Sequence, residues 1–176
     1  TFFGSFSIMT EQLSPLALQA LAVVEESGAI IGANHAHPHT IRHKGRIDLV
    51  TETDIAVEAF LKERLATLAP QAGFLAEESA EDLSLPDTCW IIDPVDGTTN
   101  FAHGLPLTVT SVAYRLNGEI VLGIVNAPLL RECFIAEKGK GAWRNGERIS
   151  VSSVTACENA LVATGFPYEI ASRVDE

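Results

Sequence analysis

The chain has 176 residues, 47% of them hydrophobic and 20% charged, which excludes a disordered protein and suits one domain with a core of its own. Its formal net charge of -11 argues against a nucleic-acid backbone as the main partner, because like charges repel. No uninterrupted apolar run is as long as a membrane span, so we expect no membrane contact.

The first residues and the cysteines favour a cytoplasmic location. Residues 1–9, TFFGSFSIM, lack the basic start and the long apolar segment of a signal peptide, and we interpret them as disordered or as an upstream remnant. The three cysteines are odd in number and widely spaced, without a CxxC pair: Cys89, Cys133 and Cys157. We expect reduced thiols and no structural zinc.

A first helix is predicted from Ser14 to about Gly32, because apolar residues recur near helical spacing: Leu16, Leu21, Val24, Ile30 and Ile31. The polar stretch NHAHPHTIRHKGR that follows is expected to be an exposed loop. It holds four histidines that we interpret as solvated rather than as metal ligands: His35, His37, His39 and His43.

A second amphipathic helix is predicted to begin within residues 51–54 and to end before Pro70. Its apolar face is expected to contain Ile55, Ala59, Phe60, Leu65 and Leu68. The charged residues Glu58, Lys62 and Glu63 are assigned to the solvated face.

Strands are predicted after Gly73, at residues 74–76, 89–92, 107–116, 119–126, 131–137, 148–151 and 161–164. Asn117-Gly118 and Asn145-Gly146 are strong signals of tight hairpin turns. Two helices followed by an antiparallel meander indicate an α+β fold, with the two N-terminal helices packed on an antiparallel sheet.

The segment WIIDPVDGTTNF, residues 90–101, carries the most chemical information. The strand is expected to stop at Pro94, which leaves Asp93 and Asp96 at the mouth of the sheet. Gly97 and Thr98 resemble a helix start, whose free N–H groups can hold a phosphate. Acids beside amides suggest metal-assisted phosphate chemistry, although a capped turn would explain the aspartates equally well.

Three further features favour the chemical interpretation: the pair Glu77-Glu78, Asp54 at the second helix start, and the Thr98 hydroxyl. Oxygen-only ligands suit Mg²⁺ or Mn²⁺, and about two or three ions would neutralise these acids together with a phosphate. Asp54 and Thr98 could jointly orient and deprotonate a metal-bound water that attacks phosphorus. Metal ligands are expected from Glu77, Asp93, the Val95 carbonyl and Asp96.

The sequence WIIDPVDGTTNFAHGLP resembles the signature of the inositol monophosphatase family, within the lithium-sensitive, magnesium-dependent phosphatase superfamily. DLVTETD, FLAEES and GIVNAPLLRECFIAEKGKGAWRNGERISVS match in family order, so the resemblance covers most of residues 10–165. It implies the same metal ligands and the same catalytic pair, with Glu77 also catalytic. Substrate contacts would come from Glu77, Val95, Asp96, Gly97 and Thr98. Glu78 would support the ligands, and Lys44 would belong to a nearby mobile loop.

The resemblance also implies a domain organisation. Residues 10–165 would form the N-terminal α+β phosphatase domain, the first half of a layered α/β/α/β/α sugar-phosphatase fold, and residues 166–176 the start of a truncated second half. Family members carry a W-D-x-A-A-G-like motif whose aspartate completes a metal site, and this sequence has none. The chain would therefore be a fragment of a longer enzyme or a short form with a damaged site, and inactive or weak alone.

We therefore expect Mg²⁺-dependent hydrolysis of a small phosphorylated polyol or sugar, with myo-inositol monophosphate as the leading substrate and a homodimer when full length. One alternative is another sugar- or nucleotide-phosphate phosphatase of the superfamily. The other is a catalytically inactive, truncated binding module. A Walker-A loop and a GxGxxG loop are both absent from the sequence.

Overall fold

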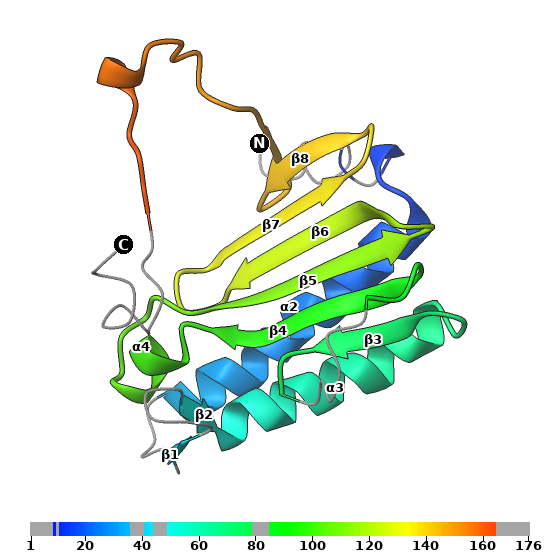
Figure 1. The fold of residues 1–176 in the computed structure, drawn as a ribbon, viewed down its shortest axis with the longest axis vertical. Helices are drawn as coiled ribbons and strands as arrows, with labels where there is room; N and C mark the ends of the chain where they lie inside the picture. The colour runs from blue at the N-terminus through cyan, green and yellow to red at the C-terminus, as the bar shows by residue number, and fades with distance from the viewer. Residues whose placement is uncertain (1–8, 10, 36–40, 44–48, 79–84, 165–176) are drawn as a thin grey trace, which may run out of the picture.

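Two long helices lie side by side on one face of a seven-stranded sheet (Figure 1). The computed structural model describes residues 9, 11–35, 41–43, 49–78 and 85–164, with only the backbone of 41–43 and 49–50. The long helices are α2 (Pro15–His35) and α3 (Glu52–Leu68). A short helix, α4 (Thr98–Ala102), follows the strand β4, and a 3-10 turn, η1 (Cys157–Asn159), lies near the end of the described chain.

The strands of the sheet are hydrogen-bonded in chain order from β3 to β9. They are β3 (Gly73–Ala76), β4 (Cys89–Asp96), β5 (Val109–Leu116), β6 (Glu119–Ala127), β7 (Glu132–Glu137), β8 (Gly141–Arg144) and β9 (Glu147–Ile149). The α+β prediction is confirmed, but β3 pairs with β4 in parallel, so the sheet is mixed rather than wholly antiparallel. The segment between these strands is about a dozen residues long, enough to return the chain for a parallel pair.

Both predicted hairpin turns are confirmed, and each has the left-handed backbone that its Asn-Gly pair permits. Asn117 and Gly118 have φ values of 53° and 84°, and they join β5 to β6. Asn145 and Gly146 have φ values of 49° and 81°, and they join β8 to β9. Local sequence therefore sets the register of the two hairpins.

Two loop and strand predictions were wrong. The polar stretch expected to be a loop from Asn34 onward begins inside α2, and its residues Ile41–His43 form β1, which pairs antiparallel with β2 (Leu49–Thr51). Residues 161–164 do not form the predicted strand: they are exposed, and none of the strands in the described part of the chain pairs with them. Apolar residues alone do not make a strand without an edge to pair with. His37, His39 and Lys44 lie outside the described residues.

The buried face of α3 agrees only in part with the predicted one: Leu65 is buried and Phe60 and Leu68 pack against the core, as expected. Ile55 is 49% exposed and Ala59 is exposed, whereas the buried residues are Thr53, Asp54, Val57, Glu58, Leu61 and Leu65. The assignment of Glu58 to a solvated face was also wrong, because this residue is only 5% exposed. Half of the buried residues are polar, so apolar spacing alone identified only part of the buried face.

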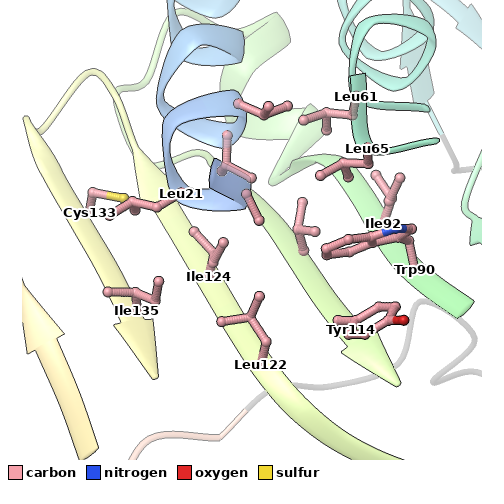
Figure 2. Close-up of a cluster of buried hydrophobic side chains, with 14 of the residues drawn as sticks. Leu21, Leu61, Leu65, Trp90, Ile92, Tyr114, Leu122, Ile124, Cys133 and Ile135 are labelled. Carbon is pink, nitrogen blue, oxygen red and sulfur yellow. The ribbon is translucent and has the colours of Figure 1, made fainter. Parts of the chain in front are cut away.

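The core lies between the two helices and the sheet. Figure 2 shows Leu21 of α2 and Leu61 and Leu65 of α3 above side chains from four strands, among them Trp90, Ile92, Tyr114, Leu122, Ile124 and Ile135. Met9 also belongs to this core and is 2% exposed, while residues 1–8 lie outside the described part of the chain. This packing fixes the first turn of α3, which contains Asp54, and the last residues of β4, which include Asp93 and Asp96.

The helix α2 is long and apolar enough to span a membrane, with a mean hydropathy of 1.4 over its most apolar window. The sequence had led us to expect no apolar run of membrane-spanning length. Of that window, 44% is buried inside the fold. The buried side of α2, including Ala20, Val24 and Ile31, faces the core. The core accounts for the apolar character of this helix.

Candidate metal and phosphate site

The strand β4 carries the signature acids to one end of the sheet. It continues to Asp96, so the prediction that it stops at Pro94 was wrong. Its register against β5 shifts between Asp93 and Asp96, and a bulge of this kind is where a strand can hold a proline. Threonine hydroxyls of the neighbouring segment then donate to backbone carbonyls: Thr110 to Pro94 (2.9 Å) and Thr108 to Asp96 (3.0 Å).

Gly97 turns the chain from β4 into α4 and is required there on two grounds. Its φ of +92° lies in the left-handed region that side chains disfavour, and an added Cβ would lie 2.8 Å from the Leu107 carbonyl oxygen. The helix that follows is anchored by Phe101, which is fully buried. The close turn fixes where Thr98, the first residue of α4, presents its hydroxyl and backbone N–H.

Asp54 and Thr98 meet across the gap between α3 and α4. Thr98 Oγ1 lies 3.0 Å from Asp54 Oδ1 and 2.9 Å from the Val95 carbonyl oxygen, so one hydroxyl proton has two acceptors. Asp54 Oδ2 accepts hydrogen bonds from the Thr51 backbone N–H at 2.9 Å and from the Thr51 hydroxyl. Asp54 is thus a buried carboxylate held at both oxygens.

Glu77 and Asp93 lie together at the ends of the parallel strands. The Glu77 backbone N–H donates to the Ile92 carbonyl oxygen at 3.1 Å, which extends the ladder one residue beyond β3. Burial raises the pKa of Asp93 to about 8, and the nearby carboxyl groups of Glu77, Asp96 and Asp54 add to the rise. Asp93 Oδ1 is buried and has no hydrogen-bond partner among the described residues. These carboxylates therefore repel one another when they are ionised.

The chemistry of these oxygens fits a hard divalent cation. Carboxylates and a backbone carbonyl suit Mg²⁺, and a cation would relieve the repulsion at Asp93 and give its buried oxygen a partner. However, among the described residues no three His, Cys, Asp or Glu side chains are placed to hold an ion by themselves. An ion here would therefore need other oxygen donors, such as the Val95 carbonyl, water or a phosphate.

The structure brings most of the predicted site residues to one end of the sheet. Asp54, Thr98 and the Val95 carbonyl are joined by hydrogen bonds. The carboxyl groups of Glu77, Asp96 and Asp54 lie near enough to Asp93 to help raise its pKa. His35, expected to be solvated, is instead half-buried at the end of α2, with its ring centroid 5.8 Å from that of Phe101.

Two residues near the site were missed from the sequence. Thr51 caps α3 and binds Asp54 in a capping box, which the T-x-x-D spacing could have revealed. Glu58 lies one helical turn after Asp54, and its carboxylate accepts a hydrogen bond from the Glu78 backbone N–H at 2.8 Å. Its spacing of four from Asp54 was the available signal.

Comparisons with known proteins point to one family. The family model described as "Inositol monophosphatase family" matches residues 12–176. An inositol monophosphatase of Dictyostelium discoideum is 44% identical over 154 residues, covering 85% of this chain and 57% of that protein. The chain thus spans little more than half the length of this relative.

Solved structures share the fold. The extragenic suppressor protein suhB of Bartonella henselae is 33% identical with a TM-score of 0.75, over 80% of this chain and 56% of that one. A second structure, described as an IMPase/NADP phosphatase complexed with Mg²⁺ and phosphate, is 28% identical with a TM-score of 0.63, over 70% of this chain and 48% of that one. The same architecture therefore occurs in a protein that binds a divalent metal and phosphate.

Proposed function

Because the chain belongs to the inositol monophosphatase family, we propose that it supplies the metal-binding and water-activating part of a Mg²⁺-dependent phosphate monoester hydrolase. The observation that carries this proposal is that two pairs of side chains lie side by side: Glu77 with Asp93, and Asp54 with Thr98. Burial and the neighbouring Glu77 carboxyl group raise the pKa of Asp93 to about 8, and Asp54 is hydrogen-bonded to Thr98 beside these two acids. A metal-dependent phosphatase needs both the metal-binding acids and the water-activating pair in one place.

The metal ligands would be Glu77, Asp93, the Val95 carbonyl and Asp96, with Mn²⁺ as a substitute for Mg²⁺. Divalent ions bound there would polarise the phosphoryl group and lower the pKa of an attacking water. About two or three ions would be needed to balance the acids and the phosphate. The related structure with Mg²⁺ and phosphate supports the use of divalent metal.

The Asp54–Thr98 pair would accept the proton of the attacking water. Thr98 Oγ1 can donate to Asp54 Oδ1 and still accept a hydrogen bond from a water through its lone pairs. Asp54 is held by Thr51 on its other oxygen, so the direction of the hydroxyl is set in advance. The backbone N–H groups of Gly97 and Thr98 would contact the phosphate.

Myo-inositol monophosphate is the leading substrate, since an inositol monophosphatase is among the relatives. Another sugar or nucleotide phosphate is the alternative, and the name of the IMPase/NADP phosphatase supports it. An inactive binding module is the third candidate, and turnover assays distinguish it from the two enzymes. We further propose a cytoplasmic enzyme, lithium-sensitive and homodimeric when full length.

The test is phosphate release from myo-inositol monophosphate, fructose bisphosphate and NADP with Mg²⁺ present. It is run on the 176-residue chain and, where the coding sequence continues past Glu176, on the longer product. We expect little or no turnover by the 176-residue chain and Mg²⁺-dependent turnover by a longer product. Retention of that turnover by Glu77→Gln would contradict the site, and absence of turnover in a folded longer product would favour the binding module.

A further inference from the structure

Glu58 is a buried acid that the proposed hydrolysis does not use. It is 5% exposed on the face of α3 that also carries Asp54, one helical turn away. Burying a carboxylate is unfavourable unless hydrogen bonds or opposite charges offset its lost hydration. The next two turns of the same face carry Leu61 and Leu65, so an apolar residue would suit this position in a purely structural helix.

The partners of Glu58 explain why an acid stands there. Its Oε2 accepts a hydrogen bond from the Glu78 backbone N–H at 2.8 Å, a bond between a charged acceptor and a peptide just past the end of β3. Its Oε1 lies 3.8 Å from Lys62 Nζ, which offsets part of the charge. Lys62 Nζ also lies 5.9 Å from the centre of the Phe74 ring in β3. The contacts of Glu58 therefore join α3 to the β3 end.

Glu77 is consequently tethered on both sides. Its own N–H is bound to the Ile92 carbonyl, immediately before Asp93, and the next N–H along the chain is bound to Glu58. Two consecutive peptide groups are thus fixed, one to β4 and one to α3. Because α3 also carries Asp54, a single rigid helix sets the position of both the water-activating carboxylate and the Glu77 backbone.

We infer that Glu58 is a positioning residue: by holding the Glu78 N–H it keeps the Glu77 carboxylate facing Asp93 as a preformed pair of metal ligands. This inference rests on the proposed function, because it gives Glu77 and Asp93 their role as ligands. Glu58 acts through geometry rather than charge. Loss of the acceptor frees the Glu77-Glu78 segment and weakens the metal site, while loss of the charge alone does not.

The experiment compares variants of the whole chain by Mn²⁺ titration, followed by electron paramagnetic resonance. Glu58→Leu removes the acceptor, and Glu58→Asp withdraws it by one methylene while keeping the charge. Glu58→Gln keeps an acceptor oxygen without the charge, and Glu63→Gln is the matched control on the exposed side of the same helix. We expect the Mn²⁺ dissociation constant to rise about 10- to 100-fold for Leu and Asp, and to stay within about threefold of wild type for both Gln variants.

A second readout needs no metal. In hydrogen-exchange NMR the Glu78 amide should exchange at least about tenfold faster in Glu58→Asp than in wild type, while protection in the core strands is retained. Unchanged Mn²⁺ affinity in folded Glu58→Asp would overturn the inference, as would a Glu58→Gln variant that loses as much affinity as Glu58→Leu. Unchanged protection of the Glu78 amide would overturn it as well.

An Asp93→Asn arm separates this inference from the proposed function. If Asp93→Asn weakens Mn²⁺ binding and folded Glu58→Asp does not, only the role of Glu58 is wrong. If the wild-type chain binds no Mn²⁺, or if the Asp93→Asn variant binds it as tightly as the wild type, the proposed metal site fails and the role of Glu58 fails with it.

Discussion

Thr98 Oγ1 lies 3.0 Å from Asp54 Oδ1, although the two residues are 44 positions apart in the chain. Asp54 belongs to the first turn of α3, and Thr98 begins α4 directly after the Gly97 turn. Their contact depends on both the capping box at Thr51 and the left-handed backbone at Gly97. A pair fixed by two such local structures would need no rearrangement to transfer a proton in the proposed hydrolysis.

The first prediction concerns this pair. In a turnover-competent form of the enzyme, Thr98→Ala should lower kcat by about 10²- to 10⁴-fold, the usual contribution of a positioned acid–base group. Thr98→Ser keeps the hydroxyl and should retain most of the activity. Initial rates of phosphate release measure both effects. Thr99→Ala, at the exposed neighbouring position, is the control and should change kcat little; an equal loss in this variant would point to damage to α4 instead.

The second prediction concerns pH and Asp93. The pKa of this carboxyl is raised from 3.8 to about 8 by burial and by neighbouring acids, so between these values the folded chain binds more protons than the unfolded chain. Stability of the metal-free protein should therefore fall as pH rises from about 4 to 8. After solvent screening we expect a loss on the order of 1 kcal/mol, or about 2–4 °C in the melting temperature.

Calorimetry of the metal-free protein tests this relationship. Asp93→Asn should flatten the fall and raise the melting temperature at pH 8, because the amide cannot ionise. Divalent cation should restore stability at that pH in the wild type but not in the variant. A wild-type melting temperature that rises steadily from pH 4 to 8, with Asp93→Asn following the same curve, would refute the coupling.

The third prediction uses two glycines of α2. A Cβ on Gly28 would lie 2.8 Å from Asn126 Nδ2 and 2.9 Å from Pro128 Cβ, and the Asn126 amide is already bound to the Val24 carbonyl. Gly28→Ala should therefore cost about 1–3 kcal/mol, which outweighs its gain in helix propensity. Gly32 has nothing within 4 Å of such a Cβ, so Gly32→Ala should stabilise by about 0.5–1 kcal/mol. Urea denaturation measures both, and equal effects at the two positions would contradict the packing of α2 on β6.

The fourth prediction concerns Glu137, which accepts a hydrogen bond from the Ser14 backbone N–H at 2.8 Å, just before α2. Burial raises the pKa of this carboxyl, but its bonds to Ser14 and Lys140 outweigh that and lower it overall. The stabilisation is thus present above the unfolded pKa and lost as pH falls through the folded value. At pH 7 Glu137→Gln should lower the free energy of unfolding by about 0.3–1 kcal/mol, whereas exposed Glu147→Gln should not. If the two variants were equally stable, the hydrogen bond between the Ser14 N–H and Glu137 would not stabilise the start of α2 as expected.

Local signals in the sequence predicted most of the fold. The Asn-Gly pairs fixed two hairpins, and the start of α3 followed from its T-E-T-D segment because caps and tight turns depend on a few adjacent residues. Pairing between distant segments was harder to predict from the sequence. The parallel β3–β4 pair, the bulge at Pro94 and the unpaired residues 161–164 all depend on which neighbours the folded sheet provides.

The sequence predicted which residues belong to the candidate site better than it predicted how they are arranged. Motifs predicted Asp54, Glu77, Asp93 and Thr98 as site residues, and the structure brings these four residues together. Glu58 was missed, because charged residues on a helix are usually solvated and its spacing of four from Asp54 was the one local sign of burial. Its hydrogen-bond partner lies 20 residues away, so only the packing of α3 beside the β3 end reveals its contact.

The proposed function depends on the binding of divalent cations by Glu77, Asp93, the Val95 carbonyl and Asp96. Its most direct test is an anomalous difference map from crystals of this chain grown with Mn²⁺. We expect a peak about 2.0–2.3 Å from carboxylate oxygens of Asp93, near the hard-cation distance, and no such peak in crystals of Asp93→Asn. A well-diffracting crystal with Mn²⁺ bound only elsewhere, or with the same peak in Asp93→Asn, would contradict the proposed metal site.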